Sequence, residues 1–366
     1  MSNPKSEDQE YLENLTREIY FDTVNGFLKV KDVSPIIAGA QDYLRIRRRC
    51  LAWQRRWSLR WAALVNRWLN LWKRRVCMIN GRLITPSQLI TDFAARDYVC
   101  DETIADAVYL SLVLEKPLLV EGEPGVGKTE IAKVLADLLN TELIRLQCYE
   151  GLDENKALYE WNYQKQLLYI QGHERNISDV FAEEFLMMRP LLKAIQSEGQ
   201  APVLLIDEID KADEEFEAFL LEILSDFQVS IPEFGTIKAK TIPHIIITNN
   251  DVRELTDALK RRCIYLYIDY PSVGKEEDIL RKKVPGILPS LARQVAQLMH
   301  ALRERTDLLK KPSIAEGIDL ARALTMERVN EIDEVVLDRF LPTILKNKQD
   351  MAMMRKKGKE KWLGVI

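Results

Sequence analysis

The eight residues 122–129 have the types and spacing that suit phosphate binding. They read Gly-Glu-Pro-Gly-Val-Gly-Lys-Thr, the G-x-x-x-x-G-K-T pattern of a phosphate-binding loop. Glycines let the backbone curl so that several N–H groups face one anion. Lys128 can reach the outer phosphates, and the Thr129 hydroxyl can bind a phosphate-bound magnesium ion. A strand-to-helix turn that merely uses glycine would not explain Lys and Thr together. The residues expected to hold the nucleotide are Glu123, Pro124, Gly125, Val126, Gly127, Lys128, Thr129 and Glu130.

Two adjacent carboxylates follow a continuous apolar run, residues 203–206. Ligands of open α/β sheets lie at the carboxyl ends of the strands. Asp207 can therefore hold Mg²⁺ through water, together with Thr129. Glu208 can act as general base on the attacking water. The alternative is a pair of solvated carboxylates at a strand end.

Asn250 comes just after another apolar run, residues 244–248, which we expect to neighbour the Asp207 strand. An amide there can orient the attacking water against the outermost phosphate, and Asn249 is the neighbouring candidate. The alternative is a turn formed by the Asn-Asn-Asp run.

Arg261 and Arg262 follow an expected helix, residues 255–259, and precede a strand. An arginine there can reach the nucleotide of a neighbouring subunit, and such a finger is worth roughly 10³–10⁵ in rate. A solvated basic helix end, favoured by the helix dipole, is an equal alternative.

The elements around these residues alternate between strand and helix, which predicts an α/β fold with a parallel sheet. Residues 148–168 are expected to form an insertion outside the core, and residues 227–240 a hairpin. Expected strands are 117–121, 142–146, 203–207, 244–248 and 264–268, and expected helices are 85–93, 104–114, 130–139, 185–195 and 214–224.

From about residue 272 only helical periodicity remains, at 276–284, 288–305, 313–326 and 331–349. The predicted fold class is thus an αβα parallel-sheet P-loop core followed by an all-α lid, with a mostly helical N-terminal extension. The expected domains are 1–79, 80–271 and 272–366. Residues 347–350 match the guanine-reading pattern N-K-x-D, but they follow no strand, so we expect ATP rather than GTP.

Residues 43–82 contain no acidic residue, many arginines and five of the seven tryptophans. The tryptophans keep close to one helical face. Such a stripe most often packs on the protein's own core. The other interpretations are a membrane-surface contact through residues 44–76 or an acidic partner, and a nucleic-acid contact.

Composition excludes several classes of protein. The chain has 366 residues, is 47% hydrophobic and 30% charged, and carries a net charge of −4, which disfavours nucleic acid as a partner of the whole chain. Its five cysteines are scattered and its three histidines lack metal-ligand spacing. There is no apolar run of spanning length and no signal peptide at the start. We expect a cytoplasmic protein, with a peripheral membrane contact as the variant.

The order of residues 122–129, 203–210, 248–250 and 261–263 resembles the AAA+ ATPases, and the surrounding text resembles their MoxR group. Within that group the similarity is to the CoxD-like branch associated with carbon monoxide dehydrogenase. The stretches that carry it are 146–153 (LQCYEGLD), 157–163 (ALYEWNY), 212–217 (ADEEFE) and 311–316 (KPSIAE), and it covers about residues 81–350.

The resemblance implies an ATPase with a helical lid that forms rings, usually hexamers, with ATP at subunit interfaces. It implies that Asn250 is the sensor-one residue and that Arg262, with Arg261, is the finger acting in trans. It further implies chaperone-like remodelling or metal-centre maturation of a client, often with a partner that carries a von Willebrand factor A domain. The chain departs from the family at sensor two, where Ser313 follows Pro312 and Lys311 or Arg322 could substitute. A nucleic-acid-bound AAA+ protein is the alternative function.

Overall fold

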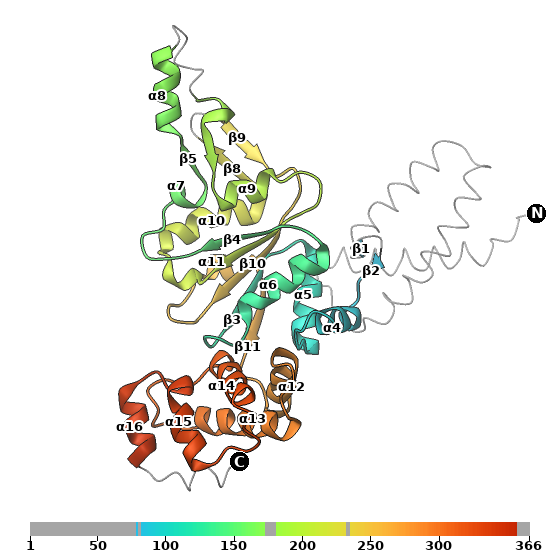
Figure 1. The fold of residues 1–366 in the computed structure, drawn as a ribbon. Helices are drawn as coiled ribbons and strands as arrows, with labels where there is room; N and C mark the ends of the chain where they lie inside the picture. Colours follow the sequence, from blue (N-terminus) through green and yellow to red (C-terminus); the bar gives the residue numbers. More distant parts are fainter. Residues whose placement is uncertain (1–77, 80–81, 173–180, 232–234, 357–366) are drawn as a thin grey trace, which may run out of the picture. The chain divides into compact units, whose positions relative to one another are not determined.

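The computed structural model describes residues 78–79, 82–172, 181–231 and 235–356, all within one compact unit of the chain (Figure 1). Several sequence-based predictions therefore lie outside the described residues. They are the basic tryptophan segment 44–76, nearly all of the proposed extension 1–79, and the turn 232–234. Among the described helices, none combines the length and the apolar character needed to cross a membrane.

A five-stranded parallel sheet forms the centre of the core (Figure 1). The strand order is β11-β3-β10-β7-β4, which confirms both the parallel sheet and the expected neighbourhood of β10 and β7. Because all five strands run the same way, their carboxyl ends meet at one edge. The strands are β3 (Leu118–Gly122), β4 (Leu143–Gln147), β7 (Val203–Asp207), β10 (His244–Asn249) and β11 (Ile264–Ile268).

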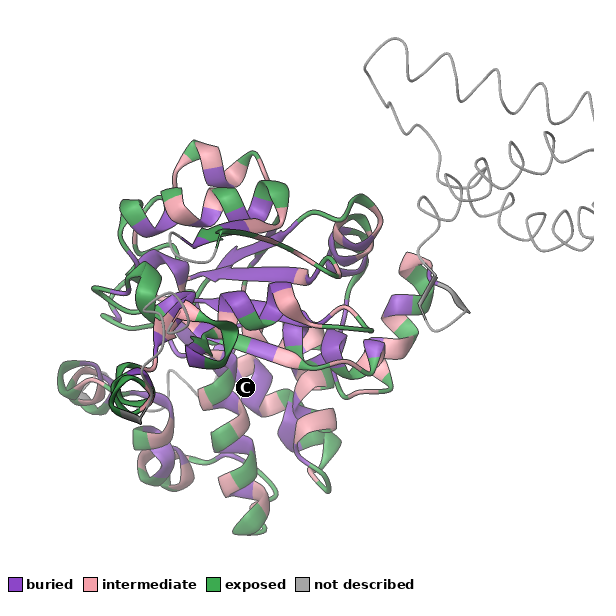
Figure 2. Cartoon of the chain, turned by 90° about the horizontal axis from the view of Figure 1, so that it is seen from above, coloured by how far each residue is buried: buried purple, intermediate pink, exposed green. Residues whose placement is uncertain are grey.

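Both faces of this sheet are covered, which explains why the strand β7 is apolar at every position before Asp207. Successive residues of a strand point to opposite faces. Leu204 and Ile206 belong to one buried cluster, while Val203 and Leu205 belong to the other. Figure 2 shows the buried strands between the two helical layers.

The helices divide between the two faces according to these clusters. The first face is covered by α4 (Pro86–Ala94), α5 (Glu102–Leu114) and α6 (Lys128–Leu139). The second is covered by α7 (Glu154–Ala157), α9 (Pro190–Gln196), α10 (Glu214–Asp226) and α11 (Asp257–Lys260). N-caps fix several of the starts: Asp101 accepts a bond from the Ile104 N–H at 2.9 Å, and Asp213 one from the Phe216 N–H at 2.8 Å.

The expected insertion 148–168 is only partly outside the core, and this corrects the prediction. Cys148, Leu158 and Trp161 are buried in the cluster of the second face. Their aromatic and polar composition hid this burial. The part that does project is α8 (Tyr163–Gly172), where Leu167 and Leu168 are exposed (Figure 1).

The expected helix 185–195 is also wrong in its first part. Residues Leu186–Met188 form strand β6, which pairs with β5 (Tyr159–Trp161), and a short 3-10 turn, Glu183–Phe185, precedes it. The helix starts only at Pro190, whose fixed φ suits the first helical position. The predicted hairpin is confirmed: β8 (Gln228–Ile231) pairs antiparallel with β9 (Gly235–Lys238). A further short pair joins β1 (Met78–Ile79) to β2 (Arg82–Leu83).

Residues after β11 are helical and build their own buried cluster. The helices are α12 (Val273–Lys283), α13 (Pro289–Arg303), α14 (Ile314–Met326), α15 (Glu334–Ile344) and α16 (Lys348–Lys356). The single helix expected at 331–349 is two helices, because Leu345 is extended. The residues of the N-K-x-D match make structural hydrogen bonds at this break between the helices. Asn347 accepts a bond from the Gln349 N–H at 2.8 Å, and buried Asp350 accepts bonds from the N–H groups of Leu309 and Lys310.

Candidate functional site

The glycine loop connects the end of β3 to the start of α6, as the sequence predicts. Gly122 has a φ of 148°, and a Cβ there would overlap the carbonyl oxygen of Ile268 at the end of β11. Gly127 has a φ of 96° and caps α6. Both positions thus require glycine, and the N-terminus of α6 points into the loop, where it favours an anion.

Lys128 is the buried cation of the loop. Its side chain is nearly enclosed, and Nζ donates to the carbonyl oxygens of Gly122 at 2.7 Å and Glu123 at 2.8 Å. Burial lowers the pKa of Lys128, while the carboxylates of Asp210 and its neighbours act in the opposite direction. The ammonium is therefore held against the inside of the loop, within reach of a phosphate bound there.

Thr129 and Asp207 are brought together from different elements. The Thr129 hydroxyl donates to Asp207 Oδ1 at 3.1 Å, and the Thr248 hydroxyl donates to the same oxygen at 2.6 Å. A hydroxyl and a carboxylate beside a phosphate loop form the donor set that Mg²⁺ takes with a nucleotide, one or two carboxylates plus phosphate oxygens. The residues present therefore fit this ion. No group of three or more His, Cys, Asp or Glu suited to a metal occurs in the described part of the chain.

Glu208 and Asn250 are also adjacent. Glu208 adopts a left-handed backbone conformation with a φ of 57°, and its N–H donates to the Thr248 hydroxyl at 2.9 Å. Asn250 Nδ2 donates to Glu208 Oε1 at 3.3 Å, and Lys211 Nζ donates to Oε2 at 2.5 Å. A carboxylate that could act as general base and an amide that could orient its water thus lie side by side.

Asn249, the neighbouring candidate, has a different environment. It is fully buried, and its Nδ2 donates to Glu121 Oε1 at 2.6 Å. Glu121 also accepts from the Tyr265 hydroxyl at 2.7 Å. This network ties the ends of β10, β3 and β11 together, so of the two asparagines only Asn250 contacts Glu208.

Three polar residues at the same edge were not singled out from the sequence. Arg145 Nη2 donates to Asp207 Oδ2 at 2.5 Å and to Gln147 Oε1 at 2.6 Å, and Gln147 Nε2 donates to Glu208 Oε2 at 2.8 Å. Asp210 accepts the Asn250 N–H at 3.3 Å, and its buried Oδ2 has no partner. The sequence signal that could have found Arg145 and Gln147 was their polar character within an otherwise apolar strand. It would have needed the pairing of β4 with β7, which the sequence did not specify.

Arg261 and Arg262 lie near the amino ends of the strands, opposite to the carboxyl ends that carry the candidate site. They precede β11, whose first residue, Ile264, pairs with the first residue of β3. Arg262 Nε donates to the Ser225 hydroxyl at 2.5 Å and Nη1 to the Ala258 carbonyl oxygen at 3.0 Å, while Arg261 is exposed. The structure thus does not bring these arginines to the phosphate loop of their own chain.

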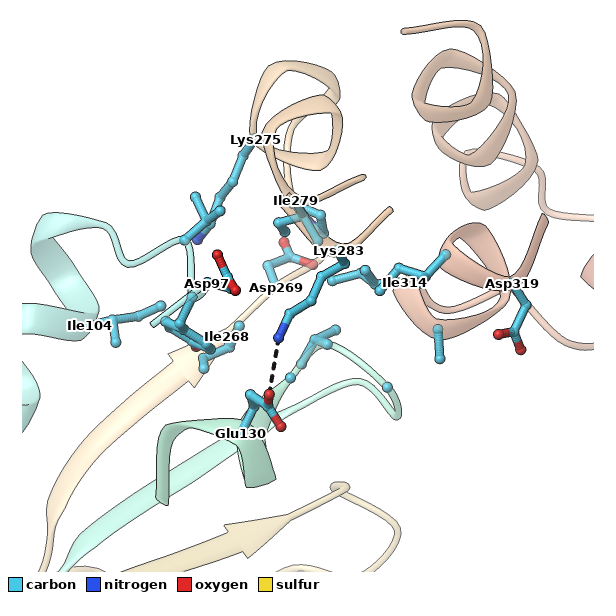
Figure 3. Close-up of a pocket in the computed structure, with 18 of the residues that line it drawn as sticks. Asp97, Ile104, Glu130, Ile268, Asp269, Lys275, Ile279, Lys283, Ile314 and Asp319 are labelled. Carbon is cyan, nitrogen blue, oxygen red and sulfur yellow. Dashed lines mark hydrogen bonds and ion pairs between the residues drawn. The ribbon is translucent and has the colours of Figure 1, made fainter. Parts of the chain in front are cut away.

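A pocket of about 340 Å³ opens beside the glycine loop, between the core and the helices after β11 (Figure 3). Its lining combines Gly125 and Gly127 with several isoleucines and several charged side chains, so both the apolar and the polar parts of a ligand could find partners there. The isoleucines are Ile104, Ile268, Ile279, Ile314 and Ile318, and the segment Asp97–Val99 and Arg322 also line the pocket.

Two lysines of α12 connect this helix to the core at the pocket. Lys283 Nζ lies 3.1 Å from Glu130 Oε1 (Figure 3). Lys275 Nζ lies 2.6 Å from Asp101 Oδ2. Burial raises the pKa of each carboxyl, but hydrogen bonds, from Lys133 and Lys283 to Glu130 and from Lys275 to Asp101, outweigh it and leave the pKa lowered.

Ser313 lies directly against the glycine loop. A Cβ on Gly125 would be 2.5 Å from Ser313 Cβ and Oγ. The serine begins α14 with a capping box, in which Glu316 accepts from the Ser313 N–H at 2.9 Å. Of the two candidate substitutes for sensor two, Arg322 lines the pocket, whereas Lys311 is exposed outside its lining.

The glycine loop after β3, the carboxylate pair at the end of β7 and the parallel sheet that carries them define a domain of the P-loop class. Within that class, residues 117–263 match the AAA domain of the dynein-related subfamily. This part of the chain is therefore an AAA domain.

The relatives found by sequence and by structure are distant. An uncharacterized protein of Staphylococcus aureus strain NCTC 8325 is 24% identical over 244 residues, covering 61% of this chain and 81% of that protein. The same identity holds for an uncharacterized protein of strain Mu50. The RuvB Holliday junction branch migration motor of Thermotoga maritima is 16% identical, with a TM-score of 0.39, over 80% of this chain and 86% of that chain.

Proposed function

We propose that this chain is a magnesium-dependent ATPase. The observation that carries the proposal is the convergence of Lys128, Thr129, Asp207, Glu208 and Asn250 at one edge of the sheet, from separate elements. The bound magnesium ion would neutralise charge that develops on the phosphates. Thr129 and Asp207 would hold it.

The remaining residues have distinct roles in the proposed reaction. The loop N–H groups and Lys128 would bind the β- and γ-phosphates. Glu208 Oε1 would accept a proton from the attacking water, and Asn250, which already contacts that oxygen, would orient the water. Glu208 has a left-handed backbone conformation directly after β7, in keeping with strain held at functional sites.

The pocket supports adenine as the base. Its isoleucine walls suit an uncharged ring, and the chain segment Asp97–Tyr98–Val99 supplies backbone groups at its rim. The N-K-x-D match, the sequence feature that would indicate guanine, instead stabilises the start of α16 and the loop at Leu309.

The direct test is hydrolysis by the purified full-length chain. Glu208→Gln should bind Mg-ATP with affinity near that of the parent and lose at least about 10²-fold in kcat, because the proton acceptor is gone. Lys211→Ala, which removes the neighbouring cation but keeps the carboxylate, is the matched control. Parent-like turnover by Glu208→Gln would remove this residue from the mechanism.

We further propose that the active form is a ring, with a hexamer as the expected size, in which Arg262, assisted by Arg261, completes the site of a neighbouring protomer. Their position at the far edge of the sheet supports a role in trans rather than in cis. Arg262→Ala should retain nucleotide and lose about 10³-fold in turnover. Mixing it with Glu208→Gln should restore part of the activity, because each variant supplies what the other lacks. No recovery in mixtures that co-assemble would contradict the shared site.

The task of the proposed motor is remodelling or metal-centre maturation of a client protein, as in the MoxR-type and CoxD-like chains that the sequence resembles. A partner with a von Willebrand factor A domain is the expected companion. Residues 80–271 and 272–366 would be the moving core and lid, and residues 44–76 a membrane-surface contact in a cytoplasmic protein. The second function, nucleic-acid binding, depended on that basic segment, which lies outside the described residues, so it is not carried further.

A further inference from the structure

The two oxygens of the Asp207 carboxylate have different partners. Oδ1 accepts from the hydroxyls of Thr129 and Thr248. Oδ2 accepts from a charged group, Arg145 Nη2, at 2.5 Å. Hydroxyls satisfy hydrogen bonds without neutralising charge, so the electrostatic partner of Asp207 is the guanidinium.

The need for such a partner follows from burial. Only 4% of the Asp207 side chain is exposed, and a buried carboxylate is costly unless it is paired. Lys128 donates to the loop carbonyl oxygens of Gly122 and Glu123 instead. Among the described residues, Arg145 is thus the cation that is ion-paired with Asp207.

The Arg145 side chain can move away from the ion pair, whereas Asp207 is fixed by burial. The arginine side chain is 53% exposed, so it can move into solvent at small cost. It also holds Gln147 Oε1 at 2.6 Å, which would keep the guanidinium near the site after it has left the carboxylate.

Mg²⁺ and the guanidinium both require the same carboxylate. Two cations within a few ångströms of each other repel strongly, the more so beside a poorly solvated group. We propose that Arg145 is the resident counter-ion of Asp207, that Mg²⁺ displaces it, and that this competition sets the magnesium concentration at which nucleotide is held. The inference rests on the proposed function of the site and concerns a positioning residue, since Arg145 acts on the ion through Asp207.

A test can use metal-dependent binding rather than turnover. The full-length chain would be mixed with a fixed concentration of mant-ADP, a fluorescent nucleotide that an ATPase does not hydrolyse. Free Mg²⁺ would then be raised from a baseline set by a chelator. The readout is the Mg²⁺ concentration that gives half of the magnesium-dependent change in binding. In Arg145→Ala this midpoint should fall at least about fivefold, because the competing charge-assisted bond is absent.

Three further variants make the result specific. Arg145→Gln keeps a hydrogen-bonding side chain without charge, and its Mg²⁺ midpoint should fall as far as that of Arg145→Ala. This variant provides the test if the alanine variant fails to fold. Arg145→Lys retains the charge and should keep the midpoint within about twofold of the parent. Arg189→Ala is the matched control, because Arg189 is a comparably exposed arginine that is ion-paired with Glu160 instead of Asp207, and the midpoint of this variant should not move.

The outcomes separate the two proposals. An unchanged or higher midpoint in both Arg145→Ala and Arg145→Gln, with the parent showing a clear magnesium response, would overturn this inference and leave the ATPase proposal intact. An absence of nucleotide binding by the folded parent at every Mg²⁺ concentration would overturn the ATPase proposal and this inference with it. Equal falls in Arg145→Ala and Arg189→Ala would show a non-specific charge effect and also overturn the inference.

Discussion

Two regions of the molecule each contain a buried carboxylate paired with arginine, and the pairs are built differently. In the helical region, Glu276 is fully buried and Arg303 is 4% exposed. They form two parallel hydrogen bonds of 2.6 and 2.7 Å. At the site, Asp207 is buried, but Arg145 is half exposed and donates to only one of the two carboxylate oxygens of Asp207.

The surroundings reinforce the difference. The Arg303 guanidinium also donates to the Pro312 carbonyl oxygen at 2.8 Å and lies 4.6 Å from the centre of the Tyr270 ring. Such a group has no second position to move to. A pair closed on all sides stabilises one arrangement, whereas a pair with one solvent-facing partner can exchange that partner. The comparison teaches that burial of both members, rather than the ion pair itself, separates structure from function here.

Breaking the closed pair should have the largest effect on stability. Arg303→Ala leaves Glu276 buried without a partner and should lower the free energy of unfolding by about 3–5 kcal/mol. Urea denaturation of the parent and the variant would measure this. Arg303→Met, which preserves much of the volume, should lose a similar amount because the carboxylate is still unpaired. A loss below about 1 kcal/mol would show that Glu276 finds another partner.

Breaking the open pair should change stability far less. Arg145→Ala should lower the free energy of unfolding by no more than about 1 kcal/mol, because Asp207 keeps the hydrogen bonds from Thr129 and Thr248 and water can replace a guanidinium that is already half exposed. The same urea experiment, without nucleotide or Mg²⁺, gives the comparison directly. If this variant were destabilised as much as Arg303→Ala, the proposed contrast between the two pairs would be wrong.

The lysine contacts between α12 and the core should show the smallest effect, and a dependence on pH. The pKa values of Asp101 and Glu130 are lowered in the folded chain. A carboxyl with a lowered pKa stabilises the fold above its unfolded pKa, near 4, and this contribution is lost as the pH falls through the folded value. The double variant Lys275→Met/Lys283→Met should therefore be less stable by about 0.5 kcal/mol at pH 7, because water screens these partly exposed pairs.

The same double variant should approach the parent in stability as the pH falls below about 4. Denaturation midpoints measured from pH 7 to pH 3 would follow this convergence. A gap between the two proteins that stays constant across that range would mean that the lysines act through packing of their alkyl chains instead.

The fold was largely predictable from the sequence because its strongest signals are local. The apolar runs ending at Asp207 and near Asn250 predicted buried parallel strands, and the glycine loop predicted the β3–α6 connection. Residues 148–161 were misplaced because their buried aromatic side chains alternate with polar ones, so burial could not be inferred from composition. The break at Leu345 was missed because both flanking helices continue the same apolar periodicity.

The site was predictable only where a motif carries it. Lys128, Thr129, Asp207 and Glu208 were found from the pattern and its spacing. Arg145 and Gln147 were missed because their role depends on which strand neighbours β7, a long-range pairing that no local pattern encodes. The choice between Asn249 and Asn250 likewise required the side-chain directions at the end of β10.

Gly122, at the start of the glycine loop, lies against Ile268, the residue that leads from the sheet to the helical region. Ile268 ends β11, and only residues 269–272 separate it from α12. A side chain at position 122 would push on that carbonyl group and so tilt the connection to the helical region. Even the smallest enlargement there, Gly122→Ala, would thus disturb how the helical region meets the core, and would also shift the carbonyl group to which Lys128 donates.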